Sequence, residues 1–142
     1  MPADQFLDAL SALQRATRRA IARPAKLAPL TGAQLELVRL VRRNPGISVT
    51  DAAAELRLAP NTVSTLVRQL TDERVLVRTA DASDRRVARL DLPPGLRREV
   101  EAWRDRRVEA MEAALAALTP EERTKLEAAL PALARLAAEV AE

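Results

Sequence analysis

Residues 60–73 read PNTVSTLVRQLTDE and predict an amphipathic helix. The apolar side chains recur at the spacing of one helix face: Val63, Leu66, Val67 and Leu70. A stripe with this period packs against a core, and proline fits the first helical turn because its missing N–H would have no helical partner there. We therefore expect a helix from residue 60 or 61 to about residue 73, with one face buried.

The opposite face of this helix is polar. Asn61, Thr65 and Arg68 point away from the apolar stripe, and Ser64 and Gln69 lie beside them. Short polar side chains can approach base edges or phosphates in the DNA major groove, and arginine reaches further, to guanine or phosphate. An ordinary solvated helix face has the same composition, so the neighbouring segments must decide between these two interpretations.

A second short helix and a turn precede this segment. Ser48 and Asp51 have the spacing of a helix-capping pair, which predicts a helix over residues 49–56 and a turn at residues 57–59. Two short helices in this order, the second with a polar outer face, are typical of the helix-turn-helix.

A β-hairpin is predicted after the second helix. Residues 75–79 are mostly β-branched and apolar, residues 87–92 alternate, and residues 81–86 (DASDRR) form a polar tip between them. An arginine at such a tip can enter the DNA minor groove, where negative potential is concentrated. The carboxylate of Asp84 repels phosphate, so it fits this role only if it pairs with Arg86 and fixes the guanidinium. A solvated charge cluster is the alternative.

Longer helices flank this region. The periodicity predicts helices over residues 4–22, 31–43, 96–118 and 120–140, and Pro131 is expected to kink or split the last one. The first and last helices carry apolar side chains with no obvious partner in the small central region: Leu7, Leu10, Leu13, Leu126, Leu130, Leu133 and Val140.

The composition excludes several classes of protein. The 142 residues fit one domain, and the chain has neither cysteine nor histidine. The sequence therefore offers no disulfide, no thiolate or imidazole metal site and no histidine general base, so we expect no metal, no cofactor and no enzyme. Charges interrupt every apolar stretch before about 18 residues, and no signal-peptide pattern begins the chain. These features predict a cytoplasmic protein without a membrane helix.

The charge is unevenly distributed along the chain. Residues 109–142 hold seven acidic and three basic residues and carry a net charge of −4, whereas residues 1–108 carry +7. A basic body of this kind is compatible with a polyanionic partner.

Five segments occur in an order and spacing that resemble the MarR (multiple antibiotic resistance regulator) family of transcriptional regulators. They are residues 30–34 (LTGAQ), 61–70, 75–78 (VLVR), 81–86 and 118–122 (LTPEE). The resemblance covers nearly the whole chain and implies one domain, mainly α with a small β-hairpin wing. In it, residues 30–95 form a winged helix-turn-helix DNA-binding lobe, and residues 1–29 and 96–142 form dimerisation helices.

The resemblance also implies a function and its residues. Such proteins are homodimers that bind pseudo-palindromic operators in double-stranded DNA, usually as repressors, and many are released by a small ligand. The DNA-binding residues carried over to this sequence are Asn61, Thr62, Ser64, Thr65, Arg68, Gln69, Asp84, Arg85 and Arg86. No ligand site is identified; Trp103 and Met111 are weak candidates, because single residues of these types on a helix are usually core fillers.

The chain departs from the family pattern at several turns. Arg57 and Ala59 stand where glycine and a capping serine are frequent, and Arg74 replaces the glycine before the first hairpin strand. Residues 93–95 (PPG) replace the usual end of the hairpin. None of these changes removes a DNA-contacting residue type. An architectural or adaptor protein that has the same fold but no specific operator is the alternative function.

Overall fold

Three helices, the first part of a fourth and a three-stranded sheet surround a mostly aliphatic core in residues 21–104 of the computed structural model, which describes residues 1–140. Contacts divide the chain into a central unit, Ile21–Arg104, and a terminal unit, which combines Met1–Ala20 with the chain from Asp105 onward. The elements of the central unit are α2 (Gly32–Arg43), β1 (Ile47–Ser48), α3 (Val49–Leu56), α4 (Pro60–Asp72), β2 (Val77–Ala80), β3 (Ala88–Asp91) and the first part of α5 (Pro94–Ala116). The predicted fold class, mainly α with a β-hairpin wing, is confirmed.

The core of the central unit is built mostly from leucine and valine. The largest fully buried side chains include Leu27, Leu37, Leu70, Leu76 and Leu90. Helix α4 contributes the predicted stripe, in which Val63, Val67 and Leu70 are each 0% exposed and Leu66 is half-buried. Because this stripe is held inside the core, the polar face of α4 points to solvent.

Side-chain caps fix where α2 and α3 begin. The hydroxyl of Thr31 accepts a hydrogen bond from the Gln34 N–H (3.3 Å), and the Gln34 side chain accepts one from the Thr31 N–H (3.0 Å). This reciprocal pair is the predicted capping box. The Ser48 hydroxyl accepts from the Asp51 N–H at 3.0 Å, so the second predicted cap is also present.

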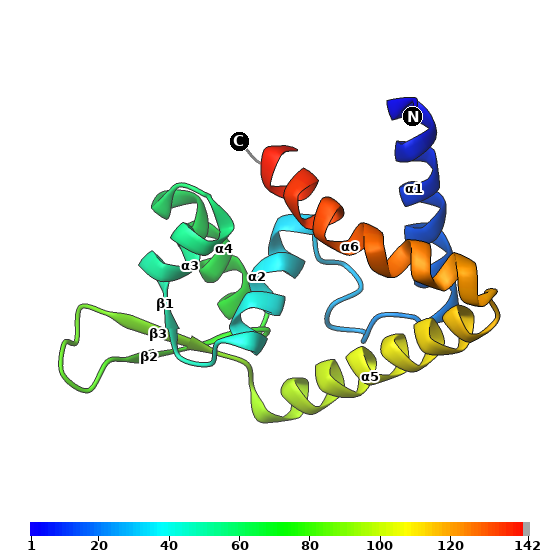
Figure 1. Cartoon of the computed structure of the whole chain (residues 1–142). Coiled ribbons are helices and arrows are strands. Elements are labelled where there is room, and N and C mark those ends of the chain that lie inside the picture. Colours follow the sequence, from blue (N-terminus) through cyan, green and yellow to red (C-terminus); the bar gives the residue numbers. More distant parts are fainter. Residues whose placement is uncertain (141–142) are drawn as a thin grey trace. The chain divides into compact units, whose positions relative to one another are not determined.

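The sheet contains one strand more than the sequence predicted. Its strands lie in the order β1-β3-β2, and both neighbouring pairs are antiparallel. Strand β1 pairs Ile47 with Leu90 and Ser48 with Arg89, and two residues are too few to give an alternating pattern in the sequence. Figure 1 shows β2 and β3 continuing into a hairpin loop that projects beyond α3 and α4.

Strand β2 begins later than predicted, at Val77 instead of Val75. The N–H groups of Val75 and Leu76 both donate to the carbonyl of Leu70, at 2.8 and 3.1 Å, so they close the end of α4 instead of pairing with β3. Both side chains are buried. Val75 and Leu76, the first part of this apolar run, therefore pack in the core, and the sheet begins after them.

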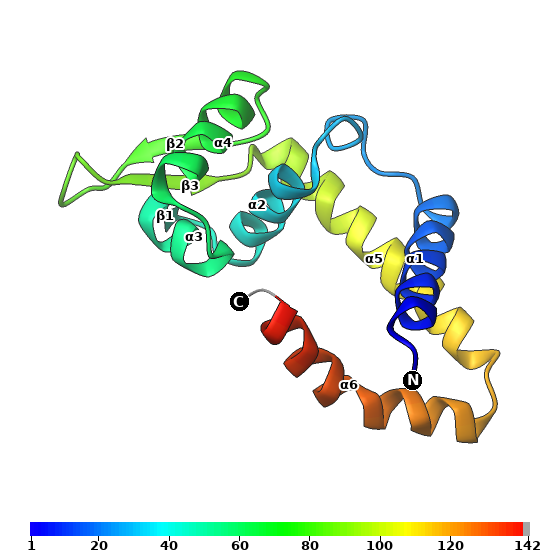
Figure 2. The ribbon, with the colours of Figure 1, turned by 90° about the horizontal axis from the view of Figure 1, so that it is seen from above.

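The terminal unit contains α1 (Ala3–Ala20), the last part of α5, and α6 (Pro120–Val140). Figure 2 shows α6 following α5 after a short turn. Neither α1 nor α6 has a buried residue within the part of the chain that the structure describes. Their exposed large apolar side chains are Leu7, Leu10, Leu13, Leu126, Leu130, Leu133, Leu136 and Val140. Exposed apolar side chains that gather in a patch are typical of interaction sites.

Helix α6 runs through Pro131, so of the two expected outcomes, a kink or a split, the split does not occur. Proline removes the hydrogen bond to the carbonyl four residues earlier, which here belongs to Glu127. Both residues are exposed, so water can reach that carbonyl, and the helix continues.

Two arginines adopt a left-handed backbone conformation at the turns on either side of α4. Arg57 has a φ of 53° and Arg74 a φ of 57°. Arg57 ends α3, and its N–H donates to the carbonyls of Ala53 and Ala54. A β-carbon makes this conformation costly, which explains why glycine is frequent at both positions in the family that the sequence resembles.

We predict that Arg57→Gly and Arg74→Gly each raise the free energy of unfolding by about 0.5–1 kcal/mol, because glycine adopts positive φ without a steric cost. The measurement is equilibrium unfolding in urea. As a control, Arg98→Gly removes the same side chain from an exposed, right-handed position in α5 and should lower stability by about 1 kcal/mol. A loss of stability in all three variants would contradict this account.

Candidate nucleic-acid interface

The outer face of α4 carries the larger part of the predicted site. Its predicted contact residues are all exposed: Asn61, Thr62, Ser64, Thr65, Arg68 and Gln69. The hydroxyl of Thr65 donates to the carbonyl of Asn61 at 3.0 Å, which holds that side chain against the helix and leaves its oxygen free to accept. The face is therefore continuous, polar and accessible along the whole helix.

The start of α4 offers backbone donors in addition to side chains. Ala59 caps the helix without a side-chain hydrogen bond, and Pro60 occupies the first turn. The N–H groups of the first turn have no helical acceptor, so those of Asn61 and Thr62 are available to water or to an anion. Together with the helix dipole, such groups favour a phosphate oxygen.

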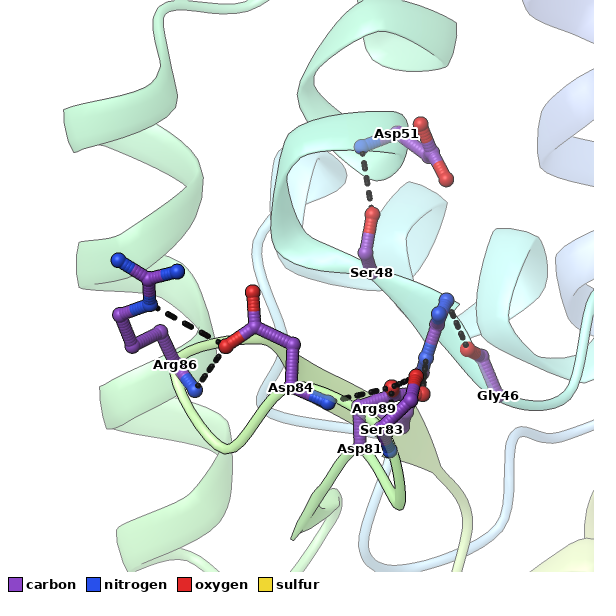
Figure 3. Close-up of polar contacts among 8 residues, drawn as sticks. All are labelled: Gly46, Ser48, Asp51, Asp81, Ser83, Asp84, Arg86 and Arg89. Carbon is purple, nitrogen blue, oxygen red and sulfur yellow. Dashed lines mark hydrogen bonds and ion pairs between the residues drawn. The ribbon is translucent and has the colours of Figure 1, made fainter.

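Asp81 organises the loop at the tip of the hairpin. Its Oδ2 accepts hydrogen bonds from the Ser83 hydroxyl (2.6 Å), the Ser83 N–H (3.1 Å) and the Asp84 N–H (3.1 Å). Its Oδ1 accepts from Nε of Arg89 at 2.9 Å (Figure 3). The hydrogen bonds from Ser83 contribute most, and with Arg89 they hold the pKa of Asp81 well below its ordinary value.

The predicted pairing of Asp84 with Arg86 is present. Asp84 Oδ1 accepts from the Arg86 N–H at 3.0 Å and from Arg86 Nε at 3.2 Å. The Arg86 side chain is nevertheless 91% exposed. Asp84 thus orients the guanidinium at one nitrogen and leaves its two terminal NH2 groups facing solvent, as Figure 3 shows.

Arg89 connects the hairpin to the segment that precedes α3. Besides its bond to Asp81, it donates from NH1 to the carbonyl of Gly46 at 3.4 Å. A groove of about 500 Å³ lies next to this connection, and its lining includes Ser64 of α4 together with Arg78 and Arg86 of the hairpin. Residues of the helix and of the wing therefore border one surface depression.

The cations of this surface are all arginines. They are Arg68, Arg78, Arg85, Arg86 and Arg89, and the chain has lysine only at positions 26 and 125. A guanidinium is charged at every physiological pH and donates in a planar fork that matches phosphate or guanine.

The structure separates the two ligand candidates. Trp103 is buried (5% exposed) in the core of the central unit, where the guanidinium of Arg39 lies 5.9 Å from its ring centroid. Met111 is partly buried and belongs to the terminal unit. The burial of Trp103 favours the core-filler interpretation of that residue. Within residues 1–140, no group of acidic side chains is placed to hold a metal ion, and no helix is long and apolar enough to cross a membrane.

Two residues that shape the wing were not among the predicted site residues. Asp81 could have been found, because an aspartate two and three residues before its N–H donors is the pattern of an Asx turn. Arg89 could not, because its contact with Asp81 depends on the register between β2 and β3, and its contact with Gly46 on the register between β1 and β3.

We predict that Asp81→Asn loosens the wing without unfolding the central unit. Asparagine keeps the size of the side chain but loses the charge that attracts Arg89, and it offers one acceptor oxygen instead of two. Amide hydrogen exchange at Ser83 and Asp84 should become faster, while exchange in α4 keeps the parent rate. Unchanged exchange in the loop would contradict the assigned role.

The lowered pKa of Asp81 also sets the pH range over which its own hydrogen bonds stabilise the loop. An ordinary aspartate titrates near pH 3.9, and a carboxylate whose folded pKa is lower stabilises the fold fully above about pH 5. That contribution disappears only as the pH falls through the folded pKa. NMR shifts of the loop amides should therefore be constant from about pH 7 to pH 4.5.

Solved structures with the same fold include proteins named as transcriptional regulators. Residues 28–87 match the sequence model of the MarR family. No sequence among curated proteins matches the chain. Among solved structures, FabT from Streptococcus pneumoniae in complex with DNA is 18% identical, with a TM-score of 0.77 over 96% of each chain.

Two further structures show the same likeness. A MarR-like transcriptional regulator from Thermotoga maritima is 18% identical, with a TM-score of 0.74 over 100% of this chain and 99% of that one. MepR, a transcription regulator of the Staphylococcus aureus multidrug efflux pump MepA, is 21% identical, with a TM-score of 0.68 over 95% and 98%. The segment that matches the MarR family model extends from before α2 to the tip of the wing, and the chain has the winged helix-turn-helix fold of these solved structures.

Proposed function

We propose that this protein binds double-stranded DNA sequence-specifically and regulates transcription as a homodimer, acting as a repressor at a pseudo-palindromic operator. One observation carries the proposal. Helix α4 buries Val63, Val67 and Leu70 on one face and exposes a continuous polar face that borders the same groove as the arginine-tipped wing. The family match supports it, and the similar fold of FabT has been solved in complex with DNA.

In this proposal, α4 and the wing contact different grooves. The major groove is about 12 Å wide and accepts a helix, so Asn61, Ser64 and Arg68 would reach base edges or phosphates there. The exposed guanidinium of Arg86 would enter the adjacent minor groove, with Asp84 fixing its orientation. Arg85, which is also exposed, would add charge at the same tip.

The exposed apolar side chains of the terminal unit support a dimer. Burying each leucine or valine contributes roughly 1.5–3 kcal/mol before the entropy of association is subtracted, so several per subunit suffice for a stable interface. A two-fold dimer places two recognition helices about 34 Å apart, one turn of DNA, which requires a near-palindromic site. The net charge of −4 in residues 109–142 suits a position away from phosphates.

Release by a small ligand completes the proposal, as the family resemblance implies. The buried position of Trp103 argues that this side chain stabilises the core and is not a wall of the ligand site. Among the similar structures, MepR is named as a regulator of a multidrug efflux pump.

An architectural or adaptor protein would use the same basic surface without choosing a sequence. The experiment that separates the two functions measures affinity for an operator against affinity for random duplex at fixed salt concentration. Phosphate contacts alone carry no sequence preference, so a large ratio supports the regulator and a ratio near one supports the architectural protein.

We predict that Arg86→Ala and Arg68→Ala weaken binding in different ways. Loss of Arg86, which would contact the minor groove by charge and shape, should weaken many sequences similarly and reduce the salt slope by about one. Loss of Arg68 should cost about 1–3 kcal/mol and relax the preference at one base pair per half-site. Fluorescence anisotropy over a salt series measures both effects. Arg19→Ala, which removes an exposed arginine from α1, is the matched control, and parent-like binding by both test variants would refute the docking proposal.

We predict that removal of all residues after Leu118 abolishes the dimer and, with it, specific DNA binding, because a monomer keeps one half-site and loses the affinity gained by linking two. Sedimentation velocity and operator titration measure the two effects. The double variant Leu126→Glu/Leu130→Glu keeps the chain length and places charges on exposed positions of α6, so it should dissociate the dimer while the central unit unfolds at the parent temperature. A stable dimer or full operator affinity in the truncated protein would contradict this assignment.

A further inference from the structure

Gln34 at the start of α2 makes two hydrogen bonds that link the capping box to the recognition helix. Its Oε1 accepts from the Thr31 N–H at 3.0 Å, and its Nε2 donates to Oε1 of Gln69 at 3.2 Å. Gln69 lies on the exposed face of α4, within the predicted DNA-contacting set. The capping box does not require the hydrogen bond from Gln34 to Gln69. The effect of that bond is therefore to be sought at Gln69.

In this series of hydrogen bonds from Thr31 through Gln34 to Gln69, one backbone group decides which atom donates and which accepts. The Thr31 N–H can only donate, so the Gln34 atom that faces it is the carbonyl oxygen. The other end of the Gln34 amide is then the NH2 group, which can only donate, and the Gln69 atom that receives it must be an oxygen. The NH2 group of Gln69 is therefore turned away from Gln34.

We infer that Gln34 is a positioning residue for DNA recognition: it orients the Gln69 amide so that α4 presents an NH2 donor at this position. This inference rests on the proposed function. A donor here selects a hydrogen-bond acceptor on the DNA, which is either a base-edge acceptor (guanine O6 or N7, adenine N7, thymine O4) or a phosphate oxygen. It disfavours a donor such as the amino group of cytosine.

Two contacts hold the backbone of α4 near Gln69, so the Gln69 amide is the part that can respond to a change. Nζ of Lys26 donates to the carbonyl of Glu73, at the end of α4, at 3.2 Å. The next residue along the helix, Leu70, is 0% exposed in the core. A change at Gln34 should therefore alter the orientation of the Gln69 side chain and leave the path of the helix as it is.

The substitution Gln34→Glu tests the inference, because it exchanges donor and acceptor between residue 34 and Gln69 while the side chain at residue 34 keeps nearly the same size. One carboxylate oxygen still accepts from the Thr31 N–H, and glutamate is as good as glutamine in a capping box. The second oxygen can no longer donate, so Gln69 must turn its NH2 group toward it and its oxygen toward the DNA. The recognition surface then presents an acceptor where the parent presents a donor.

The experiment selects duplexes from a random-sequence pool with the full-length protein, then measures affinity for every single-base variant of the selected site. If Gln69 contacts a base, Gln34→Glu should change the preference at one base pair per half-site by roughly three- to tenfold, toward cytosine or adenine with an amino group at that position. If Gln69 contacts a phosphate, Gln34→Glu should weaken the binding of all DNA sequences. The loss of affinity should be roughly three- to tenfold larger than the loss that the same substitution causes in a Gln69→Ala background.

The matched control is the same substitution in a Gln69→Ala background. It contains the added negative charge, which repels DNA in both backgrounds, but has no amide to reorient. An unfolding temperature of the Gln34→Glu variant equal to that of the parent would show that the capping box is kept. Equal effects of Gln34→Glu in the two backgrounds would overturn the inference. If the parent protein itself selects no sequence from the pool, the proposed function has failed; if the parent selects a site and the two backgrounds respond alike, only the role of Gln34 has failed.

Discussion

The burial of one stripe of helix α4 is the constraint on which the interface depends. Val63, Val67 and Leu70 lose all their contact with solvent, and each contributes roughly 1.5–3 kcal/mol of hydrophobic stabilisation. A helix held in this way cannot rotate about its axis without exposing them. The side chains on the opposite face, Arg68 among them, are thereby fixed in direction although none is buried. The packing of α4 in the core therefore makes the exposed interface rigid.

The wing has no such core, and polar contacts define its shape instead. Residues 81–86 are too polar to pack, so their conformation depends on one carboxylate that accepts four hydrogen bonds. Arg89 carries this order into the sheet and to Gly46, just before α3. The helix-turn-helix and the wing are thus connected through backbone and side-chain polar groups as well as through the sheet itself.

Local patterns in the sequence predicted most helices and strands of this fold, but they could not predict contacts between residues that are distant in the sequence. Periodicity located α4 and its buried stripe, and the capping pairs at Thr31 and Ser48 located the starts of α2 and α3. The pairing of Asp84 with Arg86 was predictable because its partners are two residues apart. Strand β1 and the contacts of Arg89 depend on strand register, which no local pattern encodes. Pro131 does not split α6, and the carbonyl that loses its hydrogen bond there belongs to an exposed residue that water can reach.

The exclusive use of arginine on the interface has a consequence for how the protein can be switched. Acetylation of lysine neutralises an ammonium group and weakens DNA binding in many basic proteins, but guanidinium groups do not undergo that modification. Neither Lys26 nor Lys125 is among the predicted contacts, so the positive charge of this surface is the same whatever the acetylation state of the chain. If the protein binds DNA as proposed, lysine acetylation would not switch that binding, and control would act through the geometry of the helices, the association of subunits or the ionic strength.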